Sequence, residues 1–182
     1  MKQRGAEGSP KRRRLRVGFQ GELGAFSQQA IRQLVGMRAL PVAHQRFDQV
    51  FAALDTGEVD AAVVPLENTL VGSIHENFDL LLKYPFEITA ETSVRVIHNL
   101  IAPPGVTFRS IKVIYSHPVA LNQCLDFFAK HPRIQRTPFY DTAGSVKMVM
   151  EQKLEGAAAI ASEFAAQTYG ANILKRDRKS VV

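Results

Sequence analysis

The chain contains a single cysteine, Cys124, and no tryptophan among its 182 residues. One cysteine excludes an intrachain disulfide framework and a cysteine-built zinc site, and it is typical of a reducing compartment. No apolar run approaches the roughly 18 residues that span a membrane. The basic N-terminus is not followed by an apolar segment, so it does not resemble a secretory signal. The sequence therefore predicts a cytoplasmic protein that does not associate with membranes.

Several chemical signatures are also missing. The five histidines are scattered, and none pairs with a carboxylate at metal-ligand spacing. There is no serine-hydrolase elbow and no phosphate-binding lysine loop. We therefore expect no metal site.

The net charge of +6 comes from the two ends of the chain. Residues 1–16 carry seven basic side chains against one acid, and residues 175–182 carry four against one. The ends thus contribute +6 and +3, which leaves −3 for the rest. No aromatic residues are interleaved with the basic ones, so nucleic-acid binding is disfavoured. Residues 1–14 are expected to be a disordered leader and residues 176–182 a basic tail.

From Leu15 onwards the pattern alternates between strand and helix. The ranges 15–19 and 60–66 are predicted as strands, the second buried on both faces because it is almost continuously apolar. Apolar residues recur at helical spacing over 26–34, 47–54 and 74–82. Residues 86–102 are long, β-branched and without a helical period, which predicts an extended crossing between lobes.

A second alternating set follows this crossing. Strands are predicted over 111–115, 134–140 and 157–161, with a further strand beginning at 172. Helices are predicted from Pro118, from Asp141 to about residue 153, and from Ser162 to Gly170. Alternation of this kind is typical of parallel sheets covered by helices. The fold class predicted is α/β with two lobes, residues 15–95 and 96–175.

Polar and glycine-rich residues follow four of the predicted strands. Free backbone N–H groups at a helix start bind anions, and ligands of such sheets bind at the carboxyl ends of the strands. Capping is the simpler explanation for Asp141, Thr142 and Ser162. The junctions comprise Gly21-Glu22-Leu23-Gly24-Ala25-Phe26-Ser27, Glu67-Asn68-Thr69 with Gly72-Ser73, Ser116-His117, and Asp141-Thr142-Ala143-Gly144-Ser145.

Glu67 and Asn68 favour a functional interpretation more strongly. A carboxylate directly after a buried strand is expected to be paired or functional, because burying it alone is costly.

Five segments occur in a characteristic order and spacing, namely GFQGELGAFSQQA, VVPLENTLVGSIHENFDLLL, SHPVALNQC, DTAGSV and AAAIASEFAAQTYGANIL. Together they resemble the prephenate dehydratase family, which includes the closely similar arogenate dehydratases. The resemblance implies two lobes like those of a type II periplasmic binding protein, with the active site in the cleft between them. It also implies conversion of prephenate to phenylpyruvate with loss of water and carbon dioxide, without a cofactor.

The resemblance assigns roles to particular residues. Glu67 and Asn68 match a pair that lines the cleft, Gln123 matches an active-site glutamine, and Thr142 matches the substrate-facing junction of the second lobe. We take these four as the candidate catalytic residues. The substrate, a dicarboxylate such as prephenate or arogenate, is expected to contact Gly24, Ala25, Phe26, Ser27, Thr69, Gly72, Ser73, Ser116, His117, Asp141, Ala143, Gly144 and Ser145. A homodimer, by analogy with the family, is a further expectation.

The sequence departs from the family at two points. Val119 stands where the family has glutamine. The family's Thr-Arg-Phe motif, whose threonine is a proposed general acid, is not found, and neither is an ACT regulatory domain. We expect the chain to be truncated at its C-terminus; alternatively, another hydroxyl such as that of Thr142 replaces the missing acid. The alternative function is a two-lobe module that binds a small anion without turning it over.

Overall fold

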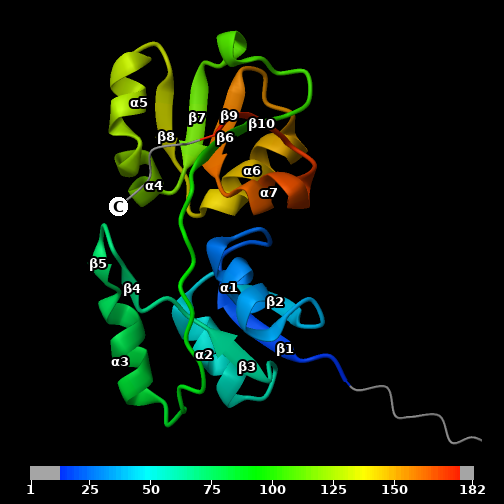
Figure 1. Ribbon diagram of the computed structural model, residues 1–182, viewed down its shortest axis with the longest axis vertical. Helices are drawn as coiled ribbons and strands as arrows, with labels where there is room; N and C mark the ends of the chain where they lie inside the picture. Colours follow the sequence, from blue (N-terminus) through cyan, green and yellow to red (C-terminus); the bar gives the residue numbers. More distant parts are fainter. Residues whose placement is uncertain (1–12, 177–182) are drawn as a thin grey trace, which may run out of the picture.

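The first lobe is built on a three-stranded parallel sheet in the computed structural model, which describes residues 13–176 (Figure 1). Strand β1 (Arg16–Gln20) lies between β2 (Leu40–His44) and β3 (Ala61–Val63). Helices α1 (Phe26–Val35) and α2 (Phe47–Asp55) pack on opposite faces of β1. Gly18 makes room for α2, because a Cβ there would lie 3.2 Å from Val59 and 3.4 Å from Val50.

Two strands of this lobe differ from expectation. Strand β2 was missed, because it is a half-exposed edge strand that carries a proline and shows little alternation. The prediction of a strand buried on both faces over 60–66 was wrong. Strand β3 has three residues and is only half-buried, because it has a neighbour on one side alone.

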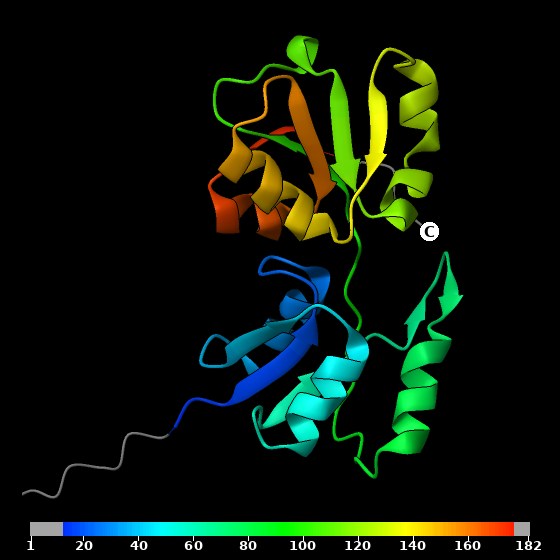
Figure 2. The same ribbon diagram turned by 180° about the vertical axis from the view of Figure 1, so that it is seen from behind.

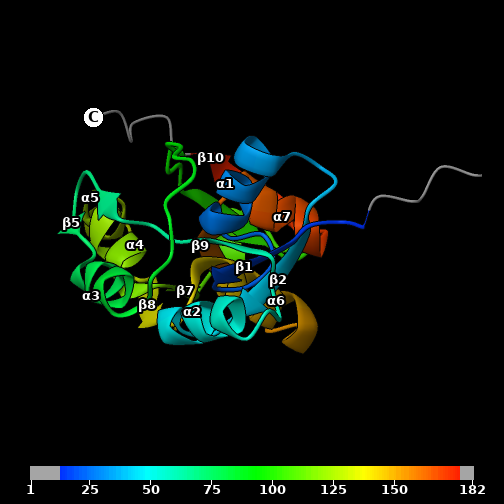
Figure 3. The same ribbon diagram turned by 90° about the horizontal axis from the view of Figure 1, so that it is seen from below.

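A small antiparallel hairpin follows β3 and was also missed. Its strands are β4 (Glu67–Asn68) and β5 (Gly72–Ser73), and helix α3 (His75–Lys83) comes next. The hairpin and α3 lie on the same side of the molecule as α4 and α5, while α1 lies on the side of α7 (Figures 1 and 3). Much of α3 is exposed, and Asn77 fixes it by donating a hydrogen bond to the carbonyl of Pro65 (2.7 Å).

Residues 84–98 form the expected extended crossing and run along the first lobe towards the second (Figure 1). Phe86 stacks on Tyr84 and on Phe51 of α2, and the ring of Tyr84 packs at a tilt against that of Phe51. Further along, the Thr92 hydroxyl hydrogen-bonds to Gln33 of α1 (2.9 Å). The crossing is thus held by side chains before it enters the second sheet.

The second lobe contains a five-stranded sheet in the order β10-β6-β9-β7-β8. Its strands are β6 (Asn99–Ala102), β7 (Val113–Ser116), β8 (Gln135–Pro138), β9 (Ala157–Ala161) and β10 (Asn172–Arg176). Strand β7 runs parallel to β8 and β9, whereas β6 is antiparallel to β9 and β10. The arrowheads of β7, β8 and β9 point towards the first lobe (Figure 2).

Two pairs of helices cover this sheet. Leu121 of α4 (Pro118–Gln123) and Phe128 of α5 (Leu125–Lys130) pack with Ala158 and Ile160 on one face. On the other face, α6 (Thr142–Gln152) and α7 (Glu163–Tyr169) pack with Ala159 and Ala161. The single helix predicted from Pro118 is broken at Cys124, while a short 3-10 turn, η1 (Phe108–Ser110), precedes β7.

The prediction of two α/β lobes with mainly parallel sheets is therefore confirmed. Most of the expected leader and tail lies outside the described residues. Arg13 and Arg16, however, form ion pairs with Asp60, and Arg14 donates to the carbonyls of Arg38 and Met37. No helix in residues 13–176 is long and apolar enough to span a membrane.

Candidate active site

The two lobes are in direct contact along one side, which we call the seam. It consists of the turn Gly21–Ala25 in the first lobe and the starts of α6 and α7 in the second. Ser162 donates its hydroxyl to the carbonyl of Gly24 (2.8 Å) and accepts the N–H of Ala165 (2.9 Å). Gly24 has a φ of 91°, and a Cβ there would lie 2.7 Å from the Cα of Ala165. A side chain at position 24 would push the lobes apart.

Asp141 ties the seam to the start of α6. Its Oδ1 accepts the N–H of Gly144 (2.6 Å), and the carboxylate also accepts the backbone N–H of Glu22 across the seam. Burial raises the pKa of the Asp141 carboxyl, while the two amide donors oppose that rise. Asp141 is therefore an N-cap shared between lobes, and its acceptor positions face protein donors.

The pKa of Asp141 predicts a pH-dependent stability. Because this pKa is higher in the folded protein than in the unfolded chain, the folded state holds the extra proton between the two values. Stability should therefore fall as pH rises from about 4 through the folded pKa. We expect urea denaturation across about pH 4–8 to show this fall in the wild type but not in Asp141→Asn, which cannot titrate. Parallel profiles for both proteins would contradict it.

Glu22 occupies the outer part of the seam. Its carboxylate accepts the hydroxyl of Tyr140 (2.7 Å) and pairs with Lys147 of α6 (3.1 Å). Burial, together with the hydrogen bond to Glu22, raises the pKa of Tyr140 above its usual range. The contact holds the turn of one lobe on the first turns of α6 in the other.

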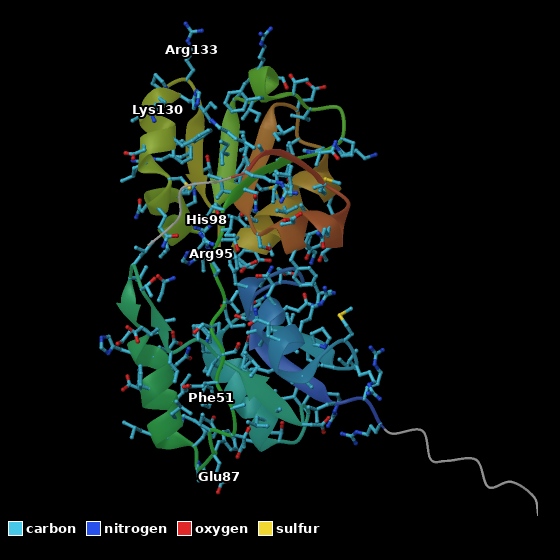
Figure 4. All side chains as sticks on the ribbon, in the orientation of Figure 1. Phe51, Glu87, Arg95, His98, Lys130 and Arg133 are labelled. Carbon is cyan, nitrogen blue, oxygen red and sulfur yellow. The ribbon has the colours of Figure 1, made fainter. Side chains whose placement is uncertain are left out.

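A second meeting point of the lobes is centred on His98, at the end of the crossing. His98 is 6% exposed, and its Nε2 lies 2.6 Å from Oε1 of Gln123 at the end of α4. Its ring meets that of Phe26, the first residue of α1, edge to face at 6.1 Å between centroids. Figure 4 shows His98 at the level where the lobes meet. This places predicted residues Phe26 and Gln123 around one side chain.

Two helix starts offer backbone donors beside these contacts. Within residues 13–176, the N–H groups of Phe26, Ser27, Thr142 and Ala143 have no acceptor. The hydroxyls of Ser27 and Thr142 likewise make no hydrogen bond in this part of the chain, and both residues are half-buried. The first turns of α1 and α6 can therefore receive an anion.

Other predicted residues have structural roles. Ser116 and Ser145 are fully buried and donate their hydroxyls to the carbonyls of Ile160 (2.6 Å) and Asp141 (2.8 Å). His117 caps α4 by accepting the N–H of Val119 at Nδ1 (3.3 Å). Burial lowers the pKa of His117, and the charge of Asp141 opposes this. In this structure the two serines hold strand ends and helix starts in position.

The hairpin residues lie on the surface. Glu67, Thr69 and Ser73 are exposed, so the cost of burying a carboxylate does not apply to Glu67, and its functional role stays a prediction. Asn68 folds the turn, since its Oδ1 accepts the N–H groups of Leu70 (2.9 Å) and Val71 (3.3 Å). Gly72 has a φ of 91° that the turn requires. The predicted junction is thus a separate hairpin that follows β3 in the first lobe.

An open depression of about 510 Å³ lies elsewhere, between β2 and α2. It is lined by His44, Gln49 and Thr56 among others, and by none of the predicted site residues. In residues 13–176, no three histidine, cysteine or acidic side chains gather as a metal site would require.

The sequence over residues 17–180 matches the family model for prephenate dehydratase. The chain belongs to the prephenate dehydratase family. It is 41% identical over 165 residues to the chloroplastic arogenate dehydratase/prephenate dehydratase 2 of Arabidopsis thaliana, covering 90% of this chain and 42% of that protein. The chain therefore spans less than half the length of this relative.

Solved structures of similar proteins support the family. The prephenate dehydratase of Arthrobacter aurescens in complex with L-Phe superposes with a TM-score of 0.81 at 29% identity, covering 90% of this chain and 55% of that one. A protein titled GqqA, described as a novel type of quorum quenching acylase, gives 0.82 at 32%, covering 91% and 60%. The prediction of the prephenate dehydratase family is thereby confirmed.

Several residues of the lobe contacts were not predicted from the sequence. They are His98, Tyr140, Lys147 and Ser162 as a seam residue. His98 carried a usable signal, since it is a polar residue inside the apolar run VRVIHNLIA. The seam pairs carried none, because their partners are more than 100 residues apart.

Proposed function

We propose that this domain binds prephenate or arogenate where its lobes meet and catalyses dehydration with decarboxylation. With prephenate the product is phenylpyruvate, a precursor of phenylalanine. The observation that carries this proposal is the match to the prephenate dehydratase family over residues 17–180. A relative 41% identical is named for both substrates.

The reaction sets two physical requirements. The ring hydroxyl is a poor leaving group until it takes up a proton and departs as water. The ring carboxylate then leaves as carbon dioxide, and its electron pair completes the aromatic ring. The site must therefore hold a dianion in one orientation and supply one proton at the hydroxyl.

The described residues can meet the first requirement. The unpaired N–H groups at the starts of α1 and α6 suit carboxylates, and Gln123 adds a side-chain amide next to His98. Glu67 and Asn68 on the hairpin are proposed to hydrogen-bond the substrate from the first lobe. Thr142, whose hydroxyl is unpaired in this part of the chain, is proposed to direct a proton towards the leaving hydroxyl.

The test is turnover of prephenate, followed as phenylpyruvate, on the 182-residue chain. Replacing Thr142 with valine keeps the shape and removes the hydroxyl, and we expect kcat to fall about a hundredfold with little change in KM. Thr168→Val is the matched control, because that hydroxyl only donates to the carbonyl of Phe164 within α7. Equal rates for Thr142→Val and the wild type would remove Thr142 from the chemistry.

Binding without turnover would support the alternative, a two-lobe module for a small anion. In that case prephenate would raise the midpoint of thermal unfolding while no phenylpyruvate formed. Running both measurements with arogenate as well distinguishes the two substrates, which differ by an amino against a keto group.

We further propose a cytoplasmic location and a homodimeric state for this protein. The single cysteine supports a reducing compartment. Light scattering on the purified chain would test the homodimer, which a mass of one 20.2 kDa chain would exclude.

A further inference from the structure

His98 stands where three segments meet: the crossing, α1 and α4. It is buried, and it contacts one predicted residue from each lobe, Phe26 and Gln123. Neither the family match nor the sequence motifs assign it a role. These contacts indicate that His98 determines which way the side-chain amide of Gln123 faces.

The chemistry of the contact determines which atom donates. A side-chain amide oxygen can only accept a hydrogen bond, so Nε2 of His98 carries the proton given to Oε1 of Gln123. The Nε2 amide group of Gln123 then points away from His98. It has no acceptor among the described residues, so its two N–H donors remain available.

An amide without such a partner rotates readily, because its terminal torsion has two broad minima. Rotation would exchange the donor face of Gln123 for its oxygen, which repels a carboxylate. The donor from His98 selects one orientation. The edge of the Phe26 ring fixes the plane of the imidazole in turn.

We propose that His98 is a positioning residue that orients the Gln123 amide to donate its N–H groups to a substrate carboxylate. Phe26 also begins α1, so His98 contacts both the Gln123 side chain and the first residue of that helix. The Gln123 amide is the proposed donor for one carboxylate of the dianion. The identity of this ligand rests on the proposed function, whereas the orientation of the amide does not.

The binding experiment measures Kd for prephenate by calorimetry in four variants of the full chain. His98→Leu removes the donor at similar volume, and Gln123→Met removes the amide. We expect each to weaken binding about tenfold, the scale of one hydrogen bond to a charged group. The double variant should bind no more weakly than Gln123→Met alone, because His98 acts only through Gln123.

His98→Gln serves as the rescue variant. Its amide nitrogen extends about as far as the imidazole Nε2 and can donate to Gln123, so Kd should return to within about threefold of the wild type. Wild-type affinity in His98→Leu, or losses that multiply in the double variant, would overturn the proposal. Equal weakening in the leucine and glutamine variants, with equal unfolding midpoints, would overturn the role of the donor.

A measurement without ligand separates this inference from the proposed function. Nitrogen-15 spectra of the wild type should show His98 protonated at Nε2, and the Gln123 side-chain amide signals should move in His98→Leu but stay near their place in His98→Gln. A His98 ring unprotonated at Nε2 would overturn the inference even if prephenate binds. If prephenate fails to bind while these spectra are as expected, the proposed function fails and the orienting contact stands.

Discussion

Replacing Gly24 with alanine is expected to destabilise the protein by about 3 kcal/mol or more. The backbone there has a φ of 91°, which costs a residue with a side chain about 1–2 kcal/mol. The new Cβ would also lie 2.7 Å from the Cα of Ala165, a backbone atom that can move only with α7. Overpacking of this kind adds about 1–3 kcal/mol. Urea denaturation, monitored by circular dichroism, measures the total loss in the free energy of unfolding.

Gly170→Ala is the matched control for Gly24→Ala. Gly170 also has a positive φ, 67°, but nothing lies within 4 Å of the Cβ that it would gain. We expect this variant to lose only about 1 kcal/mol, from backbone strain alone. Equal losses at both positions would mean that contact between the lobes at Gly24 contributes nothing to stability.

Replacing Ser162 with alanine is expected to lower the free energy of unfolding by about 2–3 kcal/mol. The hydroxyl caps α7 through the N–H of Ala165 and donates to the carbonyl of Gly24 in the other lobe. Its removal leaves a buried N–H and a buried carbonyl without those partners. The same denaturation experiment measures the loss.

Ser110→Ala provides the control for Ser162→Ala. Ser110 also donates its hydroxyl to a carbonyl and accepts an N–H, both of Thr107, but it is exposed. Water can replace these partners, so we expect a loss below about 1 kcal/mol. If Ser110→Ala costs as much as Ser162→Ala, burial at the seam is not the source of the effect.

Helices and the central strands of this protein were predictable from the sequence because each is amphipathic or continuously apolar. Helix α1 was predicted over 26–34 and found over Phe26–Val35, and the buried run Ala157–Ala161 is β9. Exposed elements of the first lobe were not, although the edge strands β8 and β10 of the second sheet were predicted. Strand β2 and the hairpin of Glu67 and Asn68 expose much of their surface, so no hydrophobic period marks them.

The site was predictable in composition but not in geometry. The polar segments after the strands indicated helix starts, and α1, α4 and α6 begin there. The sequence does not show which polar groups already hydrogen-bond to other groups inside the protein. Ser116 and Ser145 look like donors for a ligand, yet each donates to a buried carbonyl. The contact of His98 with Gln123 joins residues 25 apart, a separation at which no sequence period applies.

The placement of the seam has a mechanical consequence. The contacts of Glu22 and Gly24 with the second lobe, and of Phe26 with His98, all lie on the α1 side, and within residues 13–176 the chain crosses once, through residues 84–98. A rotation that preserves these contacts must turn about an axis running through them. The hairpin and α3 lie towards α4 and α5 instead, on the side of the lobe away from this axis (Figure 3). A small turn at Gly24 therefore becomes a larger displacement of Glu67 and Asn68 relative to α4.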